Sequence, residues 1–123
     1  NTLMETLDIK FTEIGENYVV CRMPVNFRVL QPDGILHGGA TAALVETVGS
    51  FASKYFIKDK KTSIRGVEIT TNHLKSVKSG FVYAKATNIH LGRTMQIWEI
   101  KVTDDNNNLI SLGKLTTLAL NKK

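Results

Sequence analysis

A long apolar segment that carries one acidic residue constrains the fold of this chain more than any other feature. From Gly38 to Ser53 the segment holds only Ala, Leu, Val, Phe, Gly, Thr and Ser besides Glu46. Its apolar residues recur at helical spacing over most of the circumference, which is typical of a buried helix. With 123 residues, the chain is long enough for a single real core. The sequence predicts one domain, residues 1–123, built around a helix over 38–57.

The rest of the chain has the pattern of strands separated by turns. Segments that alternate apolar with polar residues, or that are rich in β-branched residues, cover 7–14, 18–25, 62–74, 81–90, 94–104 and 109–120. The predicted order is β-β-α-β-β-β-β, in the α+β class. One sheet can cover a helix that is apolar on most sides only by curling around it, so we expect a curved antiparallel sheet. Pairing with a second copy would cover the edges of such a sheet.

Composition and charge argue against several classes of partner. Sixteen Lys and Arg against eleven Asp and Glu give a net charge of +5, but the basic residues are scattered and no nucleic-acid motif is present. No apolar run reaches the ~18–20 residues that span a bilayer. The single cysteine, Cys21, excludes an internal disulfide, fits a cytoplasmic protein and lies at an expected buried position. The histidines, at His37, His73 and His90, lack zinc-site spacing, so we expect no metal and no cofactor.

The residues around the predicted helix resemble a known family. The matching motifs are Gln31-Pro32, then Gly34-Ile35-Leu36-His37-Gly38-Gly39, then Leu44-x-Glu46-x-x-Gly49-Ser50. Together they are similar to the signature of PaaI-type acyl-CoA thioesterases, which have the hotdog fold. Within that group the chain resembles most the branch of 4-hydroxybenzoyl-CoA and 1,4-dihydroxy-2-naphthoyl-CoA thioesterases. The resemblance implies hydrolysis of an acyl-CoA whose acyl group is aryl or of medium size. It also implies a homodimer with shared active sites, with a dimer of dimers (a homotetramer) as the larger assembly.

Thioester hydrolysis needs a group that stabilises the oxyanion and a group that delivers or replaces water. The N-terminus of a helix offers free N–H groups to negative charge, and glycine lets a carbonyl approach the backbone closely. Gly38 is the predicted oxyanion donor, with Gly39 packed behind it. The alternative is that both glycines only shape the corner between loop and helix. Glu46 is the predicted general base or nucleophile, and the sequence does not separate these two roles.

Further contacts follow from the resemblance and from the chemistry of the substrate. Gln31 and His37 are expected to contact the thioester, with loop hydrogen bonding as the alternative. Ser50 either orients the Glu46 carboxylate or the water, or it bonds back to the Glu46 carbonyl. The acyl pocket is expected to include Phe51, Val48 and His73, of which His73 has a structural alternative. The residues predicted to bind the CoA phosphates are Lys75, His90, Gly92 and Arg93.

The spacing between the two predicted catalytic groups has a structural consequence. Gly38 and Glu46 are separated by roughly 12 Å along one helix, because the rise is ~1.5 Å per residue. One thioester carbonyl cannot readily contact both groups of a single chain. We therefore expect each active site to combine Gly38 of one subunit with Glu46 of another. Two other functions stay open at this point: a hydratase or dehydratase on the same fold, and a non-catalytic acyl-CoA-binding module.

Overall fold

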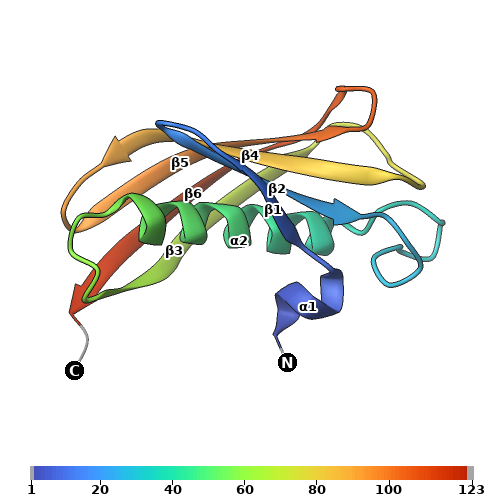
Figure 1. Ribbon diagram of the computed structural model, residues 1–123. Coiled ribbons are helices and arrows are strands. Elements are labelled where there is room, and N and C mark those ends of the chain that lie inside the picture. The colour runs from blue at the N-terminus through green and yellow to red at the C-terminus, as the bar shows by residue number, and fades with distance from the viewer. Residues whose placement is uncertain (1, 122–123) are drawn as a thin grey trace.

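The computed structural model describes residues 2–121 as one curved antiparallel sheet packed on one long helix (Figure 1). The elements in chain order are α1 (Leu3–Leu7), β1 (Lys10–Ile14), β2 (Tyr18–Pro24), α2 (Gly38–Phe56), β3 (Thr62–His73), β4 (Phe81–Leu91), β5 (Met95–Asp104) and β6 (Leu109–Asn121). The strand order in the sheet is β1-β2-β4-β5-β6-β3, and each neighbouring pair is antiparallel. The predicted α+β architecture, with a sheet curved around a central helix, is confirmed.

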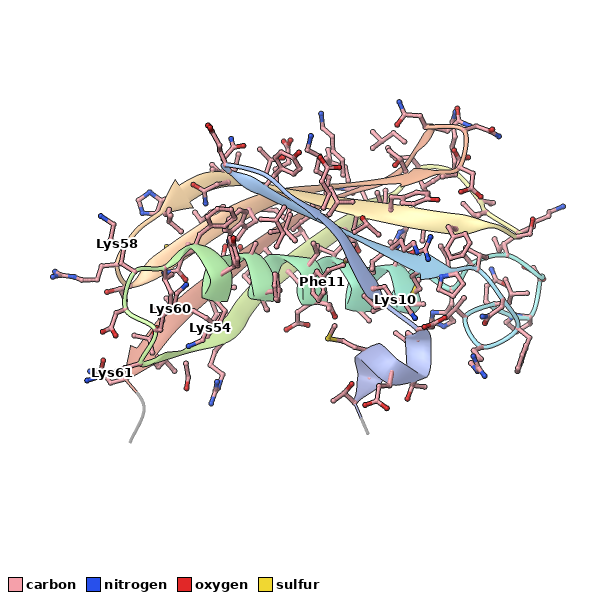
Figure 2. The ribbon with its side chains drawn as sticks, in the orientation of Figure 1. Lys10, Phe11, Lys54, Lys58, Lys60 and Lys61 are labelled. Carbon is pink, nitrogen blue, oxygen red and sulfur yellow. The ribbon has the colours of Figure 1, made fainter. Side chains whose placement is uncertain are left out.

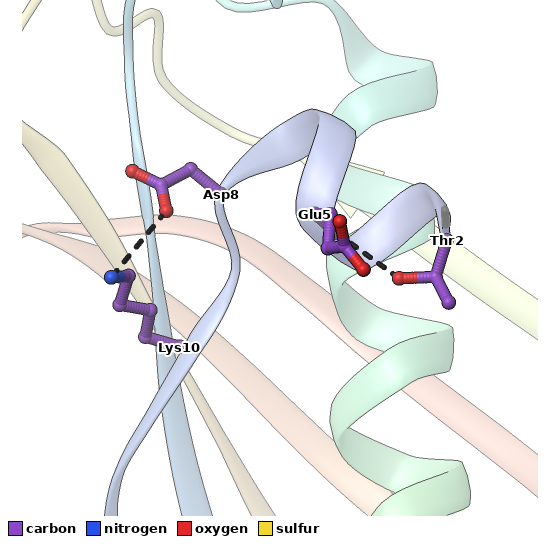
Figure 3. A network of polar contacts seen from close by, with 4 residues as sticks. All are labelled: Thr2, Glu5, Asp8 and Lys10. Carbon is purple, nitrogen blue, oxygen red and sulfur yellow. Dashed lines mark hydrogen bonds and ion pairs between the residues drawn. The ribbon is translucent and has the colours of Figure 1, made fainter.

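The short helix α1 is the one element that the sequence pattern did not indicate. It takes the place of the first residue of the strand predicted over 7–14, and β1 begins only at Lys10. The Thr2 hydroxyl caps α1 by accepting a hydrogen bond from the Glu5 N–H at 3.2 Å (Figure 3). Asp8 ends the helix with a φ of 56° and pairs with Lys10 at 3.8 Å. Caps at both ends stabilise a helix that is too short to form on propensity alone.

Helix α2 buries one side against the sheet and leaves the other side open. The buried residues follow i, i+3, i+4 spacing and are Thr41, Leu44, Val45, Val48, Gly49, Ala52 and Ser53. On the opposite side Glu46 is exposed, and Ala42, Ala43 and Ser50 are half-buried. The buried stripe of α2 is therefore narrower than the apolar pattern of the sequence indicated. The open side of α2 is available to a substrate or to a second chain.

The concave face of the sheet and the buried side of α2 enclose the core. Trp98, Ile100 and Leu115 have no exposed surface there, and neither does Cys21 on β2. Burial raises the pKa of the Cys21 thiol to about 12. The thiol is therefore neutral at physiological pH, and the expectation of a buried apolar cysteine is confirmed. No helix within residues 2–121 is long and apolar enough to cross a membrane.

The two edges of the sheet differ in length and in surface. Strand β1 has five residues, and its pairing with β2 shifts register at Phe11. Strand β3 has twelve residues, and among residues 2–121 it pairs only with β6, so no described strand covers its second edge. Its side chains include Val67, 53% exposed, and Ile69, 37% exposed. A long, partly apolar open edge is a template for pairing with another chain.

Lysine side chains hold the C-terminal end of α2 to the loop that follows it (Figure 2). The Lys54 ammonium donates to the Thr62 carbonyl at 2.6 Å and to the Lys60 carbonyl at 2.9 Å. In the opposite direction, the Lys60 ammonium donates to the Lys54 carbonyl at 3.0 Å. Cations are favourable beside the unpaired carbonyls at a helix C-terminus. These bonds leave Lys58 as the basic side chain of the loop that faces a hollow described below.

Candidate active site

The start of α2 has one backbone N–H that is occupied and one that is free. His37 is the N-cap residue, and its Nδ1 accepts a hydrogen bond from the Gly39 N–H at 2.8 Å. A neutral His37 therefore carries its proton on Nε2. Among residues 2–121, the Gly38 N–H has no hydrogen-bond acceptor. Gly39 thus has a role in forming the helix corner, whereas the Gly38 N–H is free to meet a carbonyl oxygen.

His73 lies directly against Gly38. A Cβ atom added at Gly38 would be only 2.7 Å from His73 Nε2, so the ring lies against the glycine. The other ring nitrogen, Nδ1, is 2.8 Å from the hydroxyl of Ser111 on β6. The Ser111 hydroxyl therefore fixes the imidazole through Nδ1, while Nε2 on the opposite edge of the ring faces the start of α2. The structure places His73 at the glycine end of the helix and not beside Phe51, with which the sequence grouped it.

A hollow of about 360 Å³ opens at this glycine end. Four of the predicted site residues line it: Gln31, Gly38, His73 and Lys75. The Gln31 side-chain oxygen accepts a hydrogen bond from the Asp33 N–H at 2.6 Å, so Gln31 does take part in loop hydrogen bonding. Its amide NH₂ group has no acceptor among the described residues. This group remains free to donate to a substrate.

Glu46 lies on the open side of α2 with room around its carboxylate. Within residues 2–121 the carboxylate has no hydrogen bond and no ion pair. A Cβ atom added at Gly66 on β3 would lie 2.8 Å from Glu46 Oε2, so the carboxylate occupies space that only glycine leaves free. The pairing of β3 with β6 shifts register between Gly66 and Glu68. The irregular edge strand thus makes the place in which the carboxylate sits.

A second hollow, of about 480 Å³, surrounds Glu46. Ser50 lines it one turn further along the helix, and Phe51 forms part of its wall. The Ser50 hydroxyl does not bond back to the helix, whereas the Thr47 hydroxyl does, to the Ala43 carbonyl at 2.7 Å. The structure therefore keeps Ser50 available to Glu46 or to a water molecule. Val48, in contrast, is fully buried on the sheet side and lines no part of this hollow.

The wall of this hollow also includes residues from the start of the chain that the sequence did not indicate. They are Leu3, Met4 and Phe11. The Phe11 ring packs on the Phe51 ring with centroids 4.0 Å apart, and Figure 2 shows Phe11 on β1 crossing in front of α2. The alternation of strand β1 marks Phe11 as inward-facing, but sequence cannot say which helix residue it meets. The hollow beside Glu46 is therefore apolar on the side of the N-terminal segment.

The two hollows are separate, and each contains only one of the two predicted catalytic groups. The hollow with Gly38 does not include Glu46, and the hollow with Glu46 does not include Gly38. Because α2 is continuous from Gly38 to Phe56, the two groups stay roughly 12 Å apart along its axis. One chain thus presents the two predicted catalytic groups in two separate hollows.

A third hollow, of about 740 Å³, lies at the far end of α2. Its wall includes Gly92 and Arg93 from the turn between β4 and β5, together with Lys58. His90 does not line this hollow, although its ring lies against Gly92, where an added Cβ would be 2.7 Å from Nε2. Lys75 lies at the opposite end of the helix, in the hollow with Gly38. A single chain therefore separates the residues that were expected to bind the CoA phosphates.

The described residues offer no candidate metal centre. Within 2–121, no group of three or more His, Cys, Asp or Glu side chains is placed to hold a metal ion. The polar groups at the two ends of the candidate site are the Gly38 N–H, the Glu46 carboxylate, the imidazoles of His37 and His73, and the Ser50 hydroxyl. These groups can carry out acyl transfer to water by acid–base, nucleophilic and oxyanion chemistry.

Comparison with known proteins gives one consistent result. Residues 33–111 match the model of the thioesterase superfamily. The chain is 39% identical over 114 residues to the 1,4-dihydroxy-2-naphthoyl-CoA hydrolase of Escherichia coli, covering 93% of this chain and 83% of that protein. It is 39% identical over 119 residues to the proofreading thioesterase EntH of Cronobacter turicensis, with coverage of 97% and 86%. The crystal structure of a thioesterase from Haemophilus influenzae matches with a TM-score of 0.94 and 39% identity, covering 98% of this chain and 84% of that one.

These relatives decide between the functions that the sequence left open. The matched region includes the predicted site residues Gly38, Glu46, His73 and Arg93. Names and structures agree on thioester hydrolysis, which sets aside the hydratase and the non-catalytic binding module. The chain belongs to the thioesterase superfamily and is a thioester hydrolase with the hotdog fold.

Proposed function

We propose that the protein hydrolyses acyl-CoA thioesters with Glu46 and the Gly38 N–H as its two catalytic groups. One observation carries this proposal: within residues 2–121, α2 presents a free N–H at its first residue and an unpaired carboxylate on its open side. The N–H, aided by the helix dipole, stabilises the negative oxygen that forms on the carbonyl. Glu46 acts on the other side of the reaction, where water or the carboxylate itself attacks.

The reaction balances in either of two ways. In the first, Glu46 takes a proton from water, the water oxygen bonds to the carbonyl carbon, and the C–S bond breaks to release the thiolate. The thiolate then receives the proton. In the second, a Glu46 oxygen attacks the carbonyl carbon directly and the C–S bond breaks to release the thiolate, and water then hydrolyses the resulting anhydride to the free acid and the Glu46 carboxylate. A thiol with a pKa near ~8.5 leaves without a strong general acid, so the chain needs none at this position.

We propose that the active site is shared between two copies of the chain in a homodimer. Three features support this arrangement: the ~12 Å separation of Gly38 from Glu46, their separate hollows and the open edge of β3. Two-fold symmetry makes two equivalent sites, each with Gly38 of one subunit and Glu46 of the other. A dimer of two such dimers is the larger assembly that we propose.

The same dimer would bring Lys75 of one subunit near Arg93 and Lys58 of the other, which lie at opposite ends of α2 in a single chain. With the two α2 helices antiparallel and the partner subunit's Gly38 beside Glu46, the partner's Lys75 lies towards the Phe56 end of α2. The hollow with Arg93 and Lys58 lies at that end. One CoA can then place its thioester at Glu46 and its phosphates among these cations. The hollow's 740 Å³ falls within the range of ~300–1,000 Å³ that small-molecule sites occupy.

The hollow beside Glu46 is the proposed site of the acyl group. Its walls of Met4, Phe11 and Phe51 are apolar, and the two aromatic rings in contact suit an aryl group. The name of the E. coli relative, a hydrolase of an aromatic acyl-CoA, supports the same substrate class. His73, beside Gly38, is proposed to contact the thioester together with His37 and Gln31. Ser50 is proposed to orient the Glu46 carboxylate or the attacking water.

A thiol-release screen tests this function. Aryl-, short- and long-chain acyl-CoAs are incubated with the wild-type protein and with Glu46→Ala, and free thiol is measured with a chromogenic disulfide. We expect turnover of at least one aryl-CoA by the wild type and background release by the variant. Equal release by both proteins on every substrate would contradict the proposal.

A further inference from the structure

A chain of buried hydrogen bonds connects α2 with the turn between β4 and β5. The Trp98 indole N–H donates to the Ser53 hydroxyl at 2.7 Å, and that hydroxyl lies 2.7 Å from the Thr117 hydroxyl. The Thr117 hydroxyl donates to Gln96 Oε1 at 2.8 Å. Gln96 Nε2 then donates to the Gly92 carbonyl at 2.9 Å. The four side chains have no exposed surface, so no solvent competes for these bonds.

The chemistry at its two ends fixes the direction of every bond in this chain. The Trp98 indole nitrogen can only donate, and the Gly92 carbonyl can only accept. Gln96 must therefore turn its NH₂ to Gly92 and its oxygen to Thr117. Thr117 uses its one proton on Gln96, so it accepts from Ser53, which in turn accepts from Trp98. Each hydroxyl proton is used once, and bonds aligned in this way strengthen one another in a low-dielectric interior.

Gln96 occupies a position where the sheet otherwise places apolar side chains. Its buried neighbours at alternate positions of β5 are Trp98, Ile100 and Val102. A buried amide costs free energy unless it is hydrogen-bonded, and an apolar side chain of the same size would fill the position without that cost. What the amide achieves here is a hydrogen bond to the carbonyl of one turn residue. Gln96 thus connects the buried Thr117 hydroxyl with the carbonyl of the turn residue Gly92.

Holding the Gly92 carbonyl also determines where the next N–H points. The carbonyl of Gly92 and the N–H of Arg93 belong to one planar trans peptide group, in which they point in opposite directions. Because the carbonyl is turned inward to Gln96, the Arg93 N–H is turned away from the core. Within residues 2–121 this N–H has no acceptor. Gly92 and Arg93 both line the hollow at the end of α2, together with Lys58.

Other bonds of the turn leave little freedom for a different arrangement. The Gly92 N–H donates to the Met95 carbonyl at 2.9 Å, and the Ala119 N–H donates to the Thr94 carbonyl at 2.8 Å. A Cβ atom at Gly92 would lie 2.7 Å from the Met95 carbonyl oxygen, so only glycine permits so tight a turn. Gln96 adds a third bond to this turn by holding the Gly92 carbonyl.

We propose that Gln96 is a positioning residue for phosphate binding. Its amide, oriented by the hydrogen-bond chain from Trp98, fixes the Gly92–Arg93 peptide so that the Arg93 N–H and side chain meet a phosphate oxygen of the CoA moiety. This inference rests on the proposed function, since it assumes that the hollow at the end of α2 receives the phosphates. It predicts that the kinetic constants for a substrate without these phosphates do not change when Gln96 is replaced.

The test compares benzoyl-CoA with S-benzoyl pantetheine, which has the same thioester and no phosphates. The variants are Gln96→Met, which removes the amide at similar size, and Thr117→Val, which breaks the chain one step earlier. Thr117→Ser keeps the hydroxyl and serves as the matched control. We expect KM for benzoyl-CoA to rise about tenfold in the two chain-breaking variants, as for loss of a charge-assisted hydrogen bond. Their kcat, and KM for the pantetheine thioester, stay near wild-type values, and Thr117→Ser behaves like the wild type.

The outcomes separate this inference from the proposed function. If both substrates lose activity equally, or if both chain-breaking variants fail to fold, the chain serves the fold and the inference is overturned. Arg93→Met tests the phosphate site itself. A higher KM for benzoyl-CoA in Arg93→Met but not in Gln96→Met keeps the phosphate site and overturns the role of Gln96. If the wild type turns over both substrates with the same kcat/KM, the hollow does not bind the phosphates, and the inference is overturned along with that part of the proposal.

Discussion

The first turn and the third turn of α2 carry one proposed catalytic group each, and the protein surrounds them differently. At the first turn, Gly38 lies among groups that are held in place: His73 is fixed by Ser111, and His37 caps the helix. At the third turn, the Glu46 carboxylate has space beside Gly66 and no polar partner within the described chain. An oxyanion donor works best when it is rigid, because it then needs no reorganisation during the reaction. A general base or nucleophile, in contrast, must have room to move, because it takes a proton from water or forms a bond to the carbonyl carbon.

This difference suggests how one helix can contribute to two active sites: its first turn provides the proposed oxyanion donor for one site, and its third turn provides the proposed base or nucleophile for another. The rigid end lacks the Glu46 carboxylate, and the end with Glu46 lacks the Gly38 N–H. In the proposed dimer, each half gains its complement from another copy of the chain. The following predictions change one half at a time, so that the two halves can be told apart by the kinetic constant that each one affects.

The largest effect is expected for Glu46→Gln. The amide has nearly the same size but neither accepts the proton nor attacks the carbonyl, so kcat should fall by about 10²–10⁴-fold. Thiol-release assays at saturating acyl-CoA measure kcat. The melting temperature should stay unchanged, because the Glu46 carboxylate has no hydrogen bond or ion pair within residues 2–121 that the substitution would remove. Glu16→Gln, in the turn between β1 and β2, is the matched control and should keep full activity. Full activity in Glu46→Gln would remove this residue from the mechanism.

The next largest effect separates the Gly38 N–H from the space around it. Gly38→Ala and Gly38→Pro both add a Cβ close to His73, but only proline removes the N–H. Proline is tolerated at the first position of a helix, so the fold should survive. We expect kcat/KM of Gly38→Pro to lie about 10²–10³-fold below that of Gly38→Ala, as for loss of one oxyanion donor. Equal activities in the two variants would mean that the N–H is not the donor.

A smaller effect is expected for Gly66→Ala, which acts on the Glu46 half alone. The added methyl group would stand 2.8 Å from Glu46 Oε2 and must displace the carboxylate. A displacement of that kind should reduce kcat about 10–100-fold, since catalytic groups tolerate little misplacement. A double-mutant cycle with Glu46→Gln checks the cause: Gly66→Ala should have no further effect once the carboxylate is gone. If Gly66→Ala lowers kcat by the same factor in the Glu46→Gln protein as in the wild type, the methyl group does not act through the Glu46 carboxylate.

The smallest effect is expected for Ser111→Ala, which acts on the Gly38 half alone. The hydroxyl holds His73 Nδ1, and losing one such hydrogen bond should lower kcat/KM by about 2–10-fold. The ring remains beside Gly38, so the loss should come from its freedom to turn and not from its absence. His73→Ala gives the upper limit of the effect. A Ser111→Ala variant as impaired as His73→Ala would indicate that Ser111 acts on the substrate directly.

The sequence predicts the long elements well because their patterns are local. The helix expected over 38–57 ends at Phe56, and the four later strands begin and end within one residue of their expected limits. Helical and strand periodicities depend on neighbouring residues only, so the chain reveals them directly. Helix α1 escapes this reasoning, since it depends on a cap at Thr2 and on a left-handed residue at Asp8.

The candidate site is predictable only in part, for a related reason. The motif around the helix identifies Gly38 and Glu46, but contacts between distant segments decide their surroundings. Examples are the packing of Phe11 on Phe51 and the position of Gly66 below Glu46. The amide of Gln96 looks like any polar residue of a strand until the sheet brings Thr117 beside it. Spacing along the helix could be calculated from sequence, whereas the separation into two hollows needed the structure.

Mixing two inactive variants tests the shared site most directly. Glu46→Gln and Gly38→Pro proteins are combined in equal amounts, exchanged under mild denaturant, refolded and assayed for thiol release. If each site uses Glu46 of one subunit and Gly38 of the other, half of the dimers are mixed and each has one intact site. Activity should then recover to about a quarter of the wild-type value. No recovery, with mixed dimers verified by mass spectrometry of differently tagged chains, would mean that each chain contains its own complete site.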